Sequence, residues 1–298
     1  EDMRVRVRAA DNYSNQGDYT ESTDFTLDTL NPVVSNVSAV QGAGTTDVTF
    51  TYDLSDNNTT GLTVELDISE DGGSTWTVTD TSVTGDVGSG QTTGTTKTIT
   101  WDADADFDNQ SQSDMRVRIR ATDSLNNQGS YTESTNFLVD TANPSTSNVA
   151  VVQNTGSTDA VITYDLSDGT GDLTVEIDIS NDGGSTWAVT DTSVTGNVGG
   201  SQTAGAGKTI TWDADTDFDG QYQTDMMVRV RAVDEYNNYG DYSSSSQFVV
   251  DTANPVTSNV SATQTAGTSN IVVSYDLSDN SGTGLTVEID ISDDGGSS

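Results

Sequence analysis

The stretch DMRVRIRA at residues 114–121 decides the fold, because it joins a strict alternation to a long-range repeat. Arginine alternates with valine or isoleucine, which is the period-two pattern of a half-buried β-strand. The stretch occurs again as DMRVRVRA at 2–9 and as DMMVRVRA at 225–232, at spacings of 112 and 111 residues. Repetition at one fixed spacing indicates a tandem array of a single structural unit.

Other motifs follow the same spacing. YDLSD begins at Tyr52, Tyr164 and Tyr275, and the only three prolines, Pro32, Pro144 and Pro255, lie in DTLNP, DTANP and DTANP. Proline fixes φ and removes a ladder donor, so this motif marks the joint between units. We therefore expect complete repeats at 31–140 and 143–251. The closing part of a repeat lies at 1–28 and the opening part of another at 254–298.

Each repeat is predicted to be all-β. Residues 62–68, LTVELDI, alternate apolar and polar side chains, and roughly seven short strands separated by Gly, Asn or Asp fit into each repeat. This pattern is typical of an antiparallel two-sheet β-sandwich. No apolar pattern of helical period with useful length occurs. The predicted fold is thus a series of β-sandwich repeats of about 111 residues.

The composition excludes several classes of protein. The net charge is −37, from 47 acidic and 10 basic residues, which argues against binding to nucleic acid or to an anionic membrane. Cysteine and histidine are absent, so thiolate metal sites and the commonest general base are excluded. No stretch reaches the ~20 apolar residues of a membrane span. Because its first residues already have the pattern of a strand interior, we expect the chain to be a window from a longer protein.

Two motifs resemble a known family. DMRVRIRATDSLNNQG, at 114–129, resembles strand F and the F–G loop of fibronectin type III and related immunoglobulin-like modules. The DTANP joint resembles those between tandem immunoglobulin-like repeats of giant bacterial surface proteins and adhesins. The resemblance covers the whole chain and implies an extracellular or cell-surface location. It constrains function only loosely, since such sandwiches have many roles.

The arginines are expected to pair across strands. In an immunoglobulin-like sandwich, strands C and F are neighbours. We predict that Glu65 and Asp67 face Arg116, Arg118 and Arg120, and in the next repeat that Glu176 and Asp178 face Arg229 and Arg231. Each facing pair of opposite charges contributes roughly 0.2–1 kcal/mol. The alternative is an arginine row that binds a phosphate or carboxylate ligand.

The acidic surplus gathers in loops. In these sandwiches the C–C′ and E–F loops lie at one end, and the B–C and F–G loops at the other. Stacking repeats end to end would bring the two acidic ends together beside the linker. Oxygen ligands without His or Cys suit Ca²⁺, which takes 6–8 of them. The candidate calcium ligands are Asp71, Asp102, Asp104, Asp106, Asp108, Asp140, Asp165, Asp168, Asp182, Asp213, Asp215, Asp217, Asp219, Asp234 and Asp251.

The alternative to calcium is that the acidic loops are simply solvated and keep the protein soluble. WDADADFD at 101–108 and WDADTDFD at 212–219 lack the glycine and glutamate of an EF-hand loop. The spacing of their carboxylates is therefore a weak signal on its own.

Two further patterns point toward chemistry and are better explained by structure. SEDGGSTW at 69–76 and SNDGGSTW at 180–187 match the Asp-box of sialidases, but propeller blades repeat every ~40–50 residues rather than every 111. We interpret each as a tight turn in which two glycines supply positive φ. The four tryptophans are expected in core or turn packing rather than in a sugar-binding surface. We predict no enzyme in this part of the protein.

The function that best fits these patterns is structural. We expect a segment of a large extracellular repeat protein, built as a rod stiffened by Ca²⁺ and used as an adhesin stalk or surface filament. Its partners would be neighbouring repeats and, in a filament, identical chains. The rival hypothesis is an array of modules that bind a glycan or protein ligand with avidity. A third is a spacer within a secreted hydrolase.

Overall fold

A computed structural model describes residues 2–57, 59–169, 171–282 and 284–296. The chain forms two compact units. The first consists of Glu1–Ala142 with Tyr236–Asn238, and the second of Asn143–Glu235 with Tyr239–Ser298. Each contains one complete β-sandwich, and the main boundary follows Ala142, inside the second proline motif.

Over the described residues of the first sandwich there are nine strands and a one-turn helix. In chain order they are β5 (Val33–Gln41), β6 (Asp47–Ser55), β7 (Thr60–Ser69), β8 (Val83–Gly85), β9 (Gly88–Thr92), β10 (Gly94–Asp102), α1 (Ala103–Asp106), β11 (Ser111–Thr122), β12 (Thr132–Glu133) and β13 (Phe137–Asp140).

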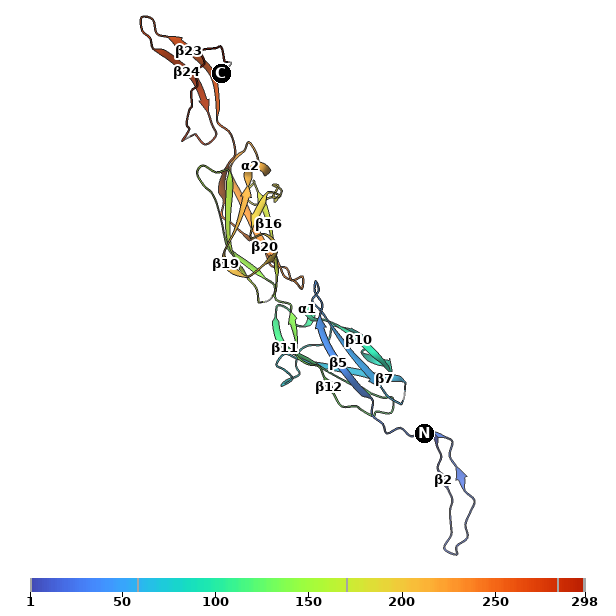
Figure 1. The fold of residues 1–298 in the computed structure, drawn as a ribbon. Coiled ribbons are helices and arrows are strands. Elements are labelled where there is room, and N and C mark those ends of the chain that lie inside the picture. The colour runs from blue at the N-terminus through green and yellow to red at the C-terminus, as the bar shows by residue number, and fades with distance from the viewer. Residues whose placement is uncertain (1, 58, 170, 283, 297–298) are drawn as a thin grey trace. The chain divides into compact units, whose positions relative to one another are not determined.

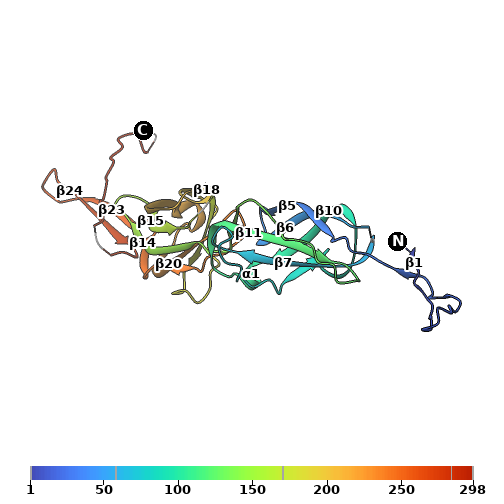
Figure 2. The ribbon, with the colours of Figure 1, turned by 90° about the horizontal axis from the view of Figure 1, so that it is seen from below.

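These strands form two sheets. One has the order β5-β6-β10-β8, and the other has the order β12-β11-β7-β9, with β13 pairing with a further part of β11. All the pairs are antiparallel. The chain passes from one sheet to the other between β6 and β7, and the two sheets face each other as layers (Figure 2).

The second sandwich repeats this arrangement with orders β14-β15-β19-β17 and β18-β16-β20-β21, and β22 pairs with β20. Its elements are labelled in part in Figure 1. They are β14 (Ser145–Gln153), β15 (Asp159–Ser167), β16 (Leu173–Ser180), β17 (Val194–Gly196), β18 (Gly199–Gln202), β19 (Gly205–Asp213), α2 (Ala214–Asp217), β20 (Tyr222–Val233), β21 (Ser243–Ser244) and β22 (Phe248–Asp251).

Each sandwich buries its own core, made by the inward positions of the alternating strands. In the first, Trp101 is fully buried, stacks on Phe50 at 6.2 Å between ring centroids, and lies beside Phe107. Trp212 is fully buried at the equivalent position of the second. The prediction of core packing is confirmed for these two tryptophans. Exclusion of such large rings from water contributes strongly to stability.

A close backbone approach holds the proline segment against the first sandwich. A Cβ added to Gly129 would lie 2.2 Å from the carbonyl oxygen of Pro32, so only glycine fits there. Gly240 has the same relation to Pro144 within the second unit, again at 2.2 Å. The glycine that ends the NNQG or NNYG stretch therefore lets the loop after β11 or β20 pack on the segment that enters the sandwich.

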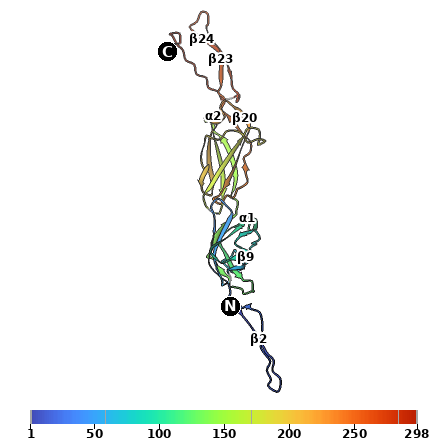
Figure 3. The same cartoon turned by 90° about the vertical axis from the view of Figure 1, so that its right-hand side faces the viewer.

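The acidic stretch at 101–108 is not an irregular loop, as the sequence indicated, but contains the helix α1. Asp102 is its N-cap, and its carboxylate accepts a hydrogen bond from Ala105 N at 3.2 Å. An aspartate at this position satisfies a helix N–H that has no partner within the helix. Figure 3 shows α1 and α2 at the ends of their own sandwiches.

Two segments at the ends of the chain form only two-stranded ladders in the described residues. Near the N-terminus β1 (Asp2–Met3) pairs with β4 (Phe25–Thr26), and β2 (Arg6–Val7) pairs with β3 (Thr20–Glu21). Near the C-terminus β23 (Val256–Gln264) pairs with β24 (Ile271–Ser278). In the part of the chain that the structure describes, no helix has both the length and the apolar character needed to cross a membrane.

Candidate cation-binding site

Three carboxylates meet in the first unit. One oxygen each from Asp28, Asp56 and Asp123 lies within 4.8 Å of the others. Asp28 follows β4, Asp56 follows β6 and Asp123 follows β11, so three separate segments supply this acidic triad. Asp123 is 5% exposed and Asp28 is 9% exposed, while Asp56 is half-buried. Gathering like charges away from water is unfavourable unless a positive charge compensates them.

Asp123 is oriented by the turn that it begins. Its Oδ1 accepts hydrogen bonds from Leu125 N and Asn127 N, both at 2.8 Å, and its Oδ2 accepts one from Asn127 Nδ2 at 2.8 Å. Burial alone raises the pKa of Asp123, but the hydrogen bonds from Asn127 and Leu125 outweigh it and hold the pKa below its usual value. Asp123 is therefore ionised at neutral pH.

The same turn holds Asp28 in place. Asn127 Nδ2 also donates to the carbonyl oxygen of Asp28 at 3.1 Å, while Asp28 Oδ1 accepts from Leu30 N at 3.0 Å. The side chain of Asn127 thus links the carboxylate of Asp123 to the backbone of Asp28. This link, together with the packing of Gly129 on Pro32, defines where the segment 28–32 lies on the sandwich.

The donor set of the triad fits a hard divalent cation. All three groups offer carboxylate oxygen, which Ca²⁺ and Mg²⁺ prefer, and the chain has neither Cys nor His to select a softer metal. Ca²⁺ takes 6–8 oxygens in irregular geometry, so backbone carbonyls or waters would supply the remainder. Three negative charges also exceed the two of the cation, which favours binding.

Sequence analysis named the counterparts of these residues but missed the triad itself. Asp28, Asp56 and Asp123 correspond by the repeat spacings of 112, 112 and 111 residues to the candidates Asp140, Asp168 and Asp234. Asp140 belongs to the first unit and is fully buried; Asp168 and Asp234 belong to the second, where Asp234 is buried and Asp168 half-buried. The repeat spacing was the signal that could have identified the triad.

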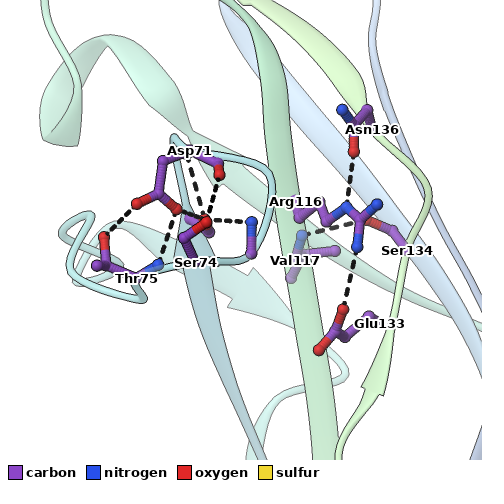
Figure 4. Close-up of polar contacts among 10 residues, drawn as sticks. Asp71, Ser74, Thr75, Arg116, Val117, Glu133, Ser134 and Asn136 are labelled. Carbon is purple, nitrogen blue, oxygen red and sulfur yellow. Dashed lines mark hydrogen bonds and ion pairs between the residues drawn. The ribbon is translucent and has the colours of Figure 1, made fainter.

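Asp71 and Asp182 serve as acceptors inside their own turns. Asp71 Oδ1 accepts from Ser69 Oγ and Thr75 N, and its Oδ2 from Thr75 Oγ1, all at 2.8 Å (Figure 4). These bonds, that from Thr75 N first, lower the pKa of Asp71. Gly72 and Gly73 have φ of 70° and 90°, as predicted for a tight turn. Asp182 makes the equivalent bonds with Ser180 and Thr186.

The acids in and around the one-turn helices have mixed roles. Asp106 accepts from Trp101 Nε1 at 3.0 Å and from Ser82 N at 2.8 Å, and Asp217 does the same for Trp212 and Ser193. Asp213 caps α2 as Asp102 caps α1. The remaining acids here, Asp104, Asp108, Asp215 and Asp219, are exposed.

The pKa of Asp104 is raised, first by a partial loss of hydration and then by the negative charges of Asp108 and Asp102. Among the described residues, the acids at 102–108 and 213–219 do not form a three-carboxylate group such as the triad. Asp165 is used elsewhere, accepting from Asn148 Nδ2 and Gly207 N, both at 2.7 Å, and Asp251 Oδ1 accepts from Ala253 N at 3.1 Å.

The predicted arginine pairing is confirmed for four of the five arginines. Arg118 lies 2.8 Å from Asp67, and Arg120 pairs with Glu65. In the second sandwich Arg229 lies 2.8 Å from Asp178 and Arg231 lies 2.6 Å from Glu176.

Arg116 is the exception. It pairs with Glu133 at 3.2 Å and donates to Asn136 at 2.6 Å instead (Figure 4). The reason is register, because Arg116 lies opposite Ser69, beyond the acidic row of β7.

Aromatic rings complete this polar face. The guanidinium of Arg118 lies 4.4 Å from the ring centroid of Trp76 and 4.1 Å from that of Tyr131, and Arg229 lies in the same way between Trp187 and Tyr242. Cation–π contacts of this kind contribute about 0.5–1 kcal/mol at exposed sites. Trp76 and Trp187 therefore pack on the arginine rows, and the arginines are engaged within their own sandwiches.

Comparison with known proteins concerns the fold alone. No family model matches the chain, and no curated protein matches it. Among solved structures, the crystal structure of the FN1–FN3 domains of chicken CNTN1 matches 85% of this chain and 78% of that chain, at 12% identity and a TM-score of 0.34. At that score the likeness carries no argument about function. The predicted fold class, tandem immunoglobulin/fibronectin III-like sandwich repeats, is confirmed by the sheets of the structure.

Proposed function

We propose that this chain is a non-catalytic structural segment of a large extracellular repeat protein, in which β-sandwiches in series form a rod stiffened by bound Ca²⁺. The rod would serve as an adhesin stalk or as part of a surface filament, with neighbouring repeats and identical chains as its partners. The two stretches that match the Asp-box form tight turns, which supports a non-catalytic role.

The acidic triad is the observation that carries this proposal. Asp28 belongs to the DTLNP motif, which the sequence identifies as the joint between repeats, whereas Asp56 and Asp123 directly follow strands β6 and β11 of the next sandwich. A cation bound by all three would tie the joint to the loops after β6 and β11. Bending at the joint would then require a metal–oxygen bond to break.

The hydrogen bonds of the joint support the same role. Asn127 links the carboxylate of Asp123 to the backbone of Asp28, and Leu30 N donates to the carboxylate of Asp28. Two of the three carboxylates are therefore held in place by hydrogen bonds of the chain. A partly preorganised site loses less entropy when it binds its ligand. The same three aspartates recur in the sequence at 140, 168 and 234.

Calcium-dependent melting of the chain tests the proposal. Binding to the folded state alone stabilises it by about 2.7 kcal/mol when free calcium is a hundredfold above its Kd. The chain should therefore melt at a higher temperature with millimolar calcium than with chelator, and magnesium at the same concentration should have a smaller effect because it loses its hydration water reluctantly. Equal melting temperatures in calcium and in chelator would contradict a cation site.

Two variants locate the effect. Asp56→Asn removes one charge from the triad and leaves the Asp123 turn intact. In calcium, it should reduce the rise in melting temperature. In chelator, it should raise stability, because it relieves the repulsion among the three carboxylates. Asp108→Asn removes an exposed charge outside the triad and should preserve the full shift. A calcium shift that is unchanged by Asp56→Asn would place the cation elsewhere.

A further inference from the structure

The first and last strands of the first sandwich lie in different sheets. β5 begins the sandwich at Val33 and β13 ends it at Asp140, and β5 pairs with β6 whereas β13 pairs with β11. Among the described residues no ladder joins β5 to β13. A pulling force transmitted along the chain enters the sandwich through β5 and leaves it through β13. The contacts between these strands therefore matter mechanically.

One side chain bridges them. The carboxamide of Gln41, the last residue of β5, donates from Nε2 to the carbonyl oxygen of Asp140 at 2.8 Å and accepts at Oε1 from the N–H of Asp140 at 2.7 Å. The amide of Gln41 thus bonds both polar groups of one residue, as a neighbouring strand would. Gln41 is 8% exposed and Asp140 is 0% exposed, so water competes poorly for these bonds.

The bridge recurs in the second sandwich. Gln153 ends β14, donates to the carbonyl oxygen of Asp251 at 3.0 Å and accepts from the N–H of Asp251 at 2.8 Å. Asp140 and Asp251 are the first residues of successive DTANP motifs. The same chemistry therefore joins the start and the end of both complete repeats.

We propose that Gln41 and Gln153 are mechanical latches, each of which locks the first strand of a sandwich to the last and sets its resistance to unfolding under tension. The C-terminal ends of β5 and β13 meet at Gln41 and Asp140. Tension pulls β5 from its N-terminal end and β13 from its C-terminal end, in opposite directions. Both hydrogen bonds are then sheared together and must break before β5 slides.

A second contact steadies the other end of β5. Thr132 Oγ1, in β12, donates to the carbonyl oxygen of Val34 at 2.7 Å, and Ser243 in the second sandwich donates in the same way to Thr146. β5 is thereby anchored near both of its ends to the opposite sheet. The latch at Gln41 has two bonds where the contact at Val34 has one, which makes Gln41 the stronger anchor.

Single-molecule pulling tests the latch. The whole chain is held by its two ends in a chelator, and the unfolding rate of each complete sandwich is measured at constant force. Gln41→Met preserves side-chain volume and removes both hydrogen bonds to Asp140, together with the weaker bond from Gln41 Nε2 to the carbonyl oxygen of Thr45 at 3.3 Å. From the usual contribution of a hydrogen bond, loss of the two bonds to Asp140 should make the first sandwich unfold about 5- to 150-fold faster. Gln153→Met should accelerate the other event and identify it.

Gln91→Met is the matched control, since among the described residues the side chain of Gln91 bonds the carbonyl of Val87, at 2.9 Å, within the same sandwich. It should change the rate less than threefold. Gln41→Asn keeps an amide but is one methylene shorter, so it should also accelerate unfolding of the first sandwich. It replaces Gln41→Met if methionine impairs folding. An unfolding rate of Gln41→Met or Gln41→Asn within threefold of the unaltered chain, or an equal acceleration by Gln91→Met, would overturn the proposal. The latch rests on the proposed function for its purpose, but its test is independent of calcium, so either can fail without the other.

Discussion

Asp106 offers the sharpest test of how the acidic stretch at 101–108 stabilises the fold. Its Oδ2 accepts from Trp101 Nε1 at 3.0 Å and from Ser82 N at 2.8 Å, and its Oδ1 accepts from the hydroxyls of Thr81 and Ser82 at 2.9 and 3.1 Å. Trp101 is fully buried in the core. Asp106→Ala removes every acceptor at once, and alanine is a good helix former, so backbone propensity in α1 is not the cause of any loss.

The expected magnitude follows from the donors left behind. The Trp101 and Ser82 N–H groups would lose their charged acceptor, and each buried donor without a partner costs about 1–3 kcal/mol. Asp106→Ala should therefore destabilise the first sandwich by about 2–5 kcal/mol. Asp106→Asn retains one oxygen for the two N–H donors, while the two hydroxyls can rotate to accept from its amide. Since bonds to a charged acceptor are roughly twice as strong as neutral ones, it should cost about 1–2 kcal/mol.

Urea denaturation, monitored by hydrogen exchange with mass spectrometry, reports the unfolding of each of the two sandwiches separately within one chain. With a slope of about 1–3 kcal/mol per molar urea, Asp106→Ala should lower the midpoint of the first sandwich by roughly 1–2 M. The second sandwich keeps Asp217 and serves as an internal reference. Asp108→Ala, at an exposed position, should change stability by less than about 0.5 kcal/mol. Equal midpoints for Asp106→Ala and Asp108→Ala would refute the reasoning.

Acid adds an independent check of the same carboxylate. Burial raises the pKa of Asp106, but the bonds from Ser82, Thr81 and Trp101 outweigh it and hold the pKa below its usual value. The stabilisation is therefore present above the unfolded-state pKa of about 3.9 and is lost as pH falls through the lower folded-state pKa. The difference between the unaltered chain and Asp106→Asn should be constant from pH 5 to 7 and should shrink below about pH 4. A difference that stays constant to pH 2 would mean that charge plays no part.

Two further changes have defined outcomes. Gly129→Ala places a Cβ 2.2 Å from the Pro32 carbonyl oxygen, and by overpacking it should destabilise the first sandwich by about 1–3 kcal/mol in urea denaturation. Gly94→Ala is the control and should be nearly neutral, because the nearest atom to its Cβ would be a lysine methylene at 3.6 Å. Equal effects of the two variants would contradict the close packing at Gly129. Burial raises the pKa of Tyr164 to about 12, and its hydroxyl donates to Asn197 O at 2.5 Å. The free energy of unfolding should therefore fall as pH rises from about 10 through 12. The absorbance of tyrosinate should show Tyr164 ionising after the exposed tyrosines. Ionisation of all the tyrosines together, below the unfolding pH, would contradict that burial.

Much of the sandwich was predictable because strand formation is local. Alternation in LTVELDI and MRVRIRA determines which side chains face the core, and the positions of Glu65 and Asp67 opposite Arg120 and Arg118 follow from pairing two such strands. Arg116 could not be assigned in this way. Its partner depends on where β7 ends and on the position of the two-residue strand β12, neither of which the alternation specifies.

The one-turn helices and the triad could not be predicted from the sequence, for different reasons. Ala103–Asp106 is too short to show a helical period. Its formation depends on the N-cap at Asp102 and on the hydrogen bonds that Trp101 and Ser82 donate to Asp106. The triad depends on three segments whose separation in sequence exceeds any local pattern. Only the equivalence of repeats connects Asp28 with Asp140. Sequence analysis applied that equivalence forward, from Asp140 to Asp251, and not back to Asp28, Asp56 and Asp123.

The structure divides the acidic residues of this chain into groups with different consequences. Asp71, Asp102 and Asp106 accept hydrogen bonds from nearby backbone or side-chain donors, which disperses their charge and stabilises a turn or a helix. Acids such as Asp108 face water, where screening weakens repulsion. Asp28 and Asp123 also accept hydrogen bonds within their turns, but unlike the other acids they are buried and lie beside a third carboxylate. If negative charge served only solubility, burial of these two would be an unnecessary penalty. A cation bound at the joint, as we propose, would remove that penalty. For this reason we expect calcium to act through the triad and not through the far more numerous exposed acids.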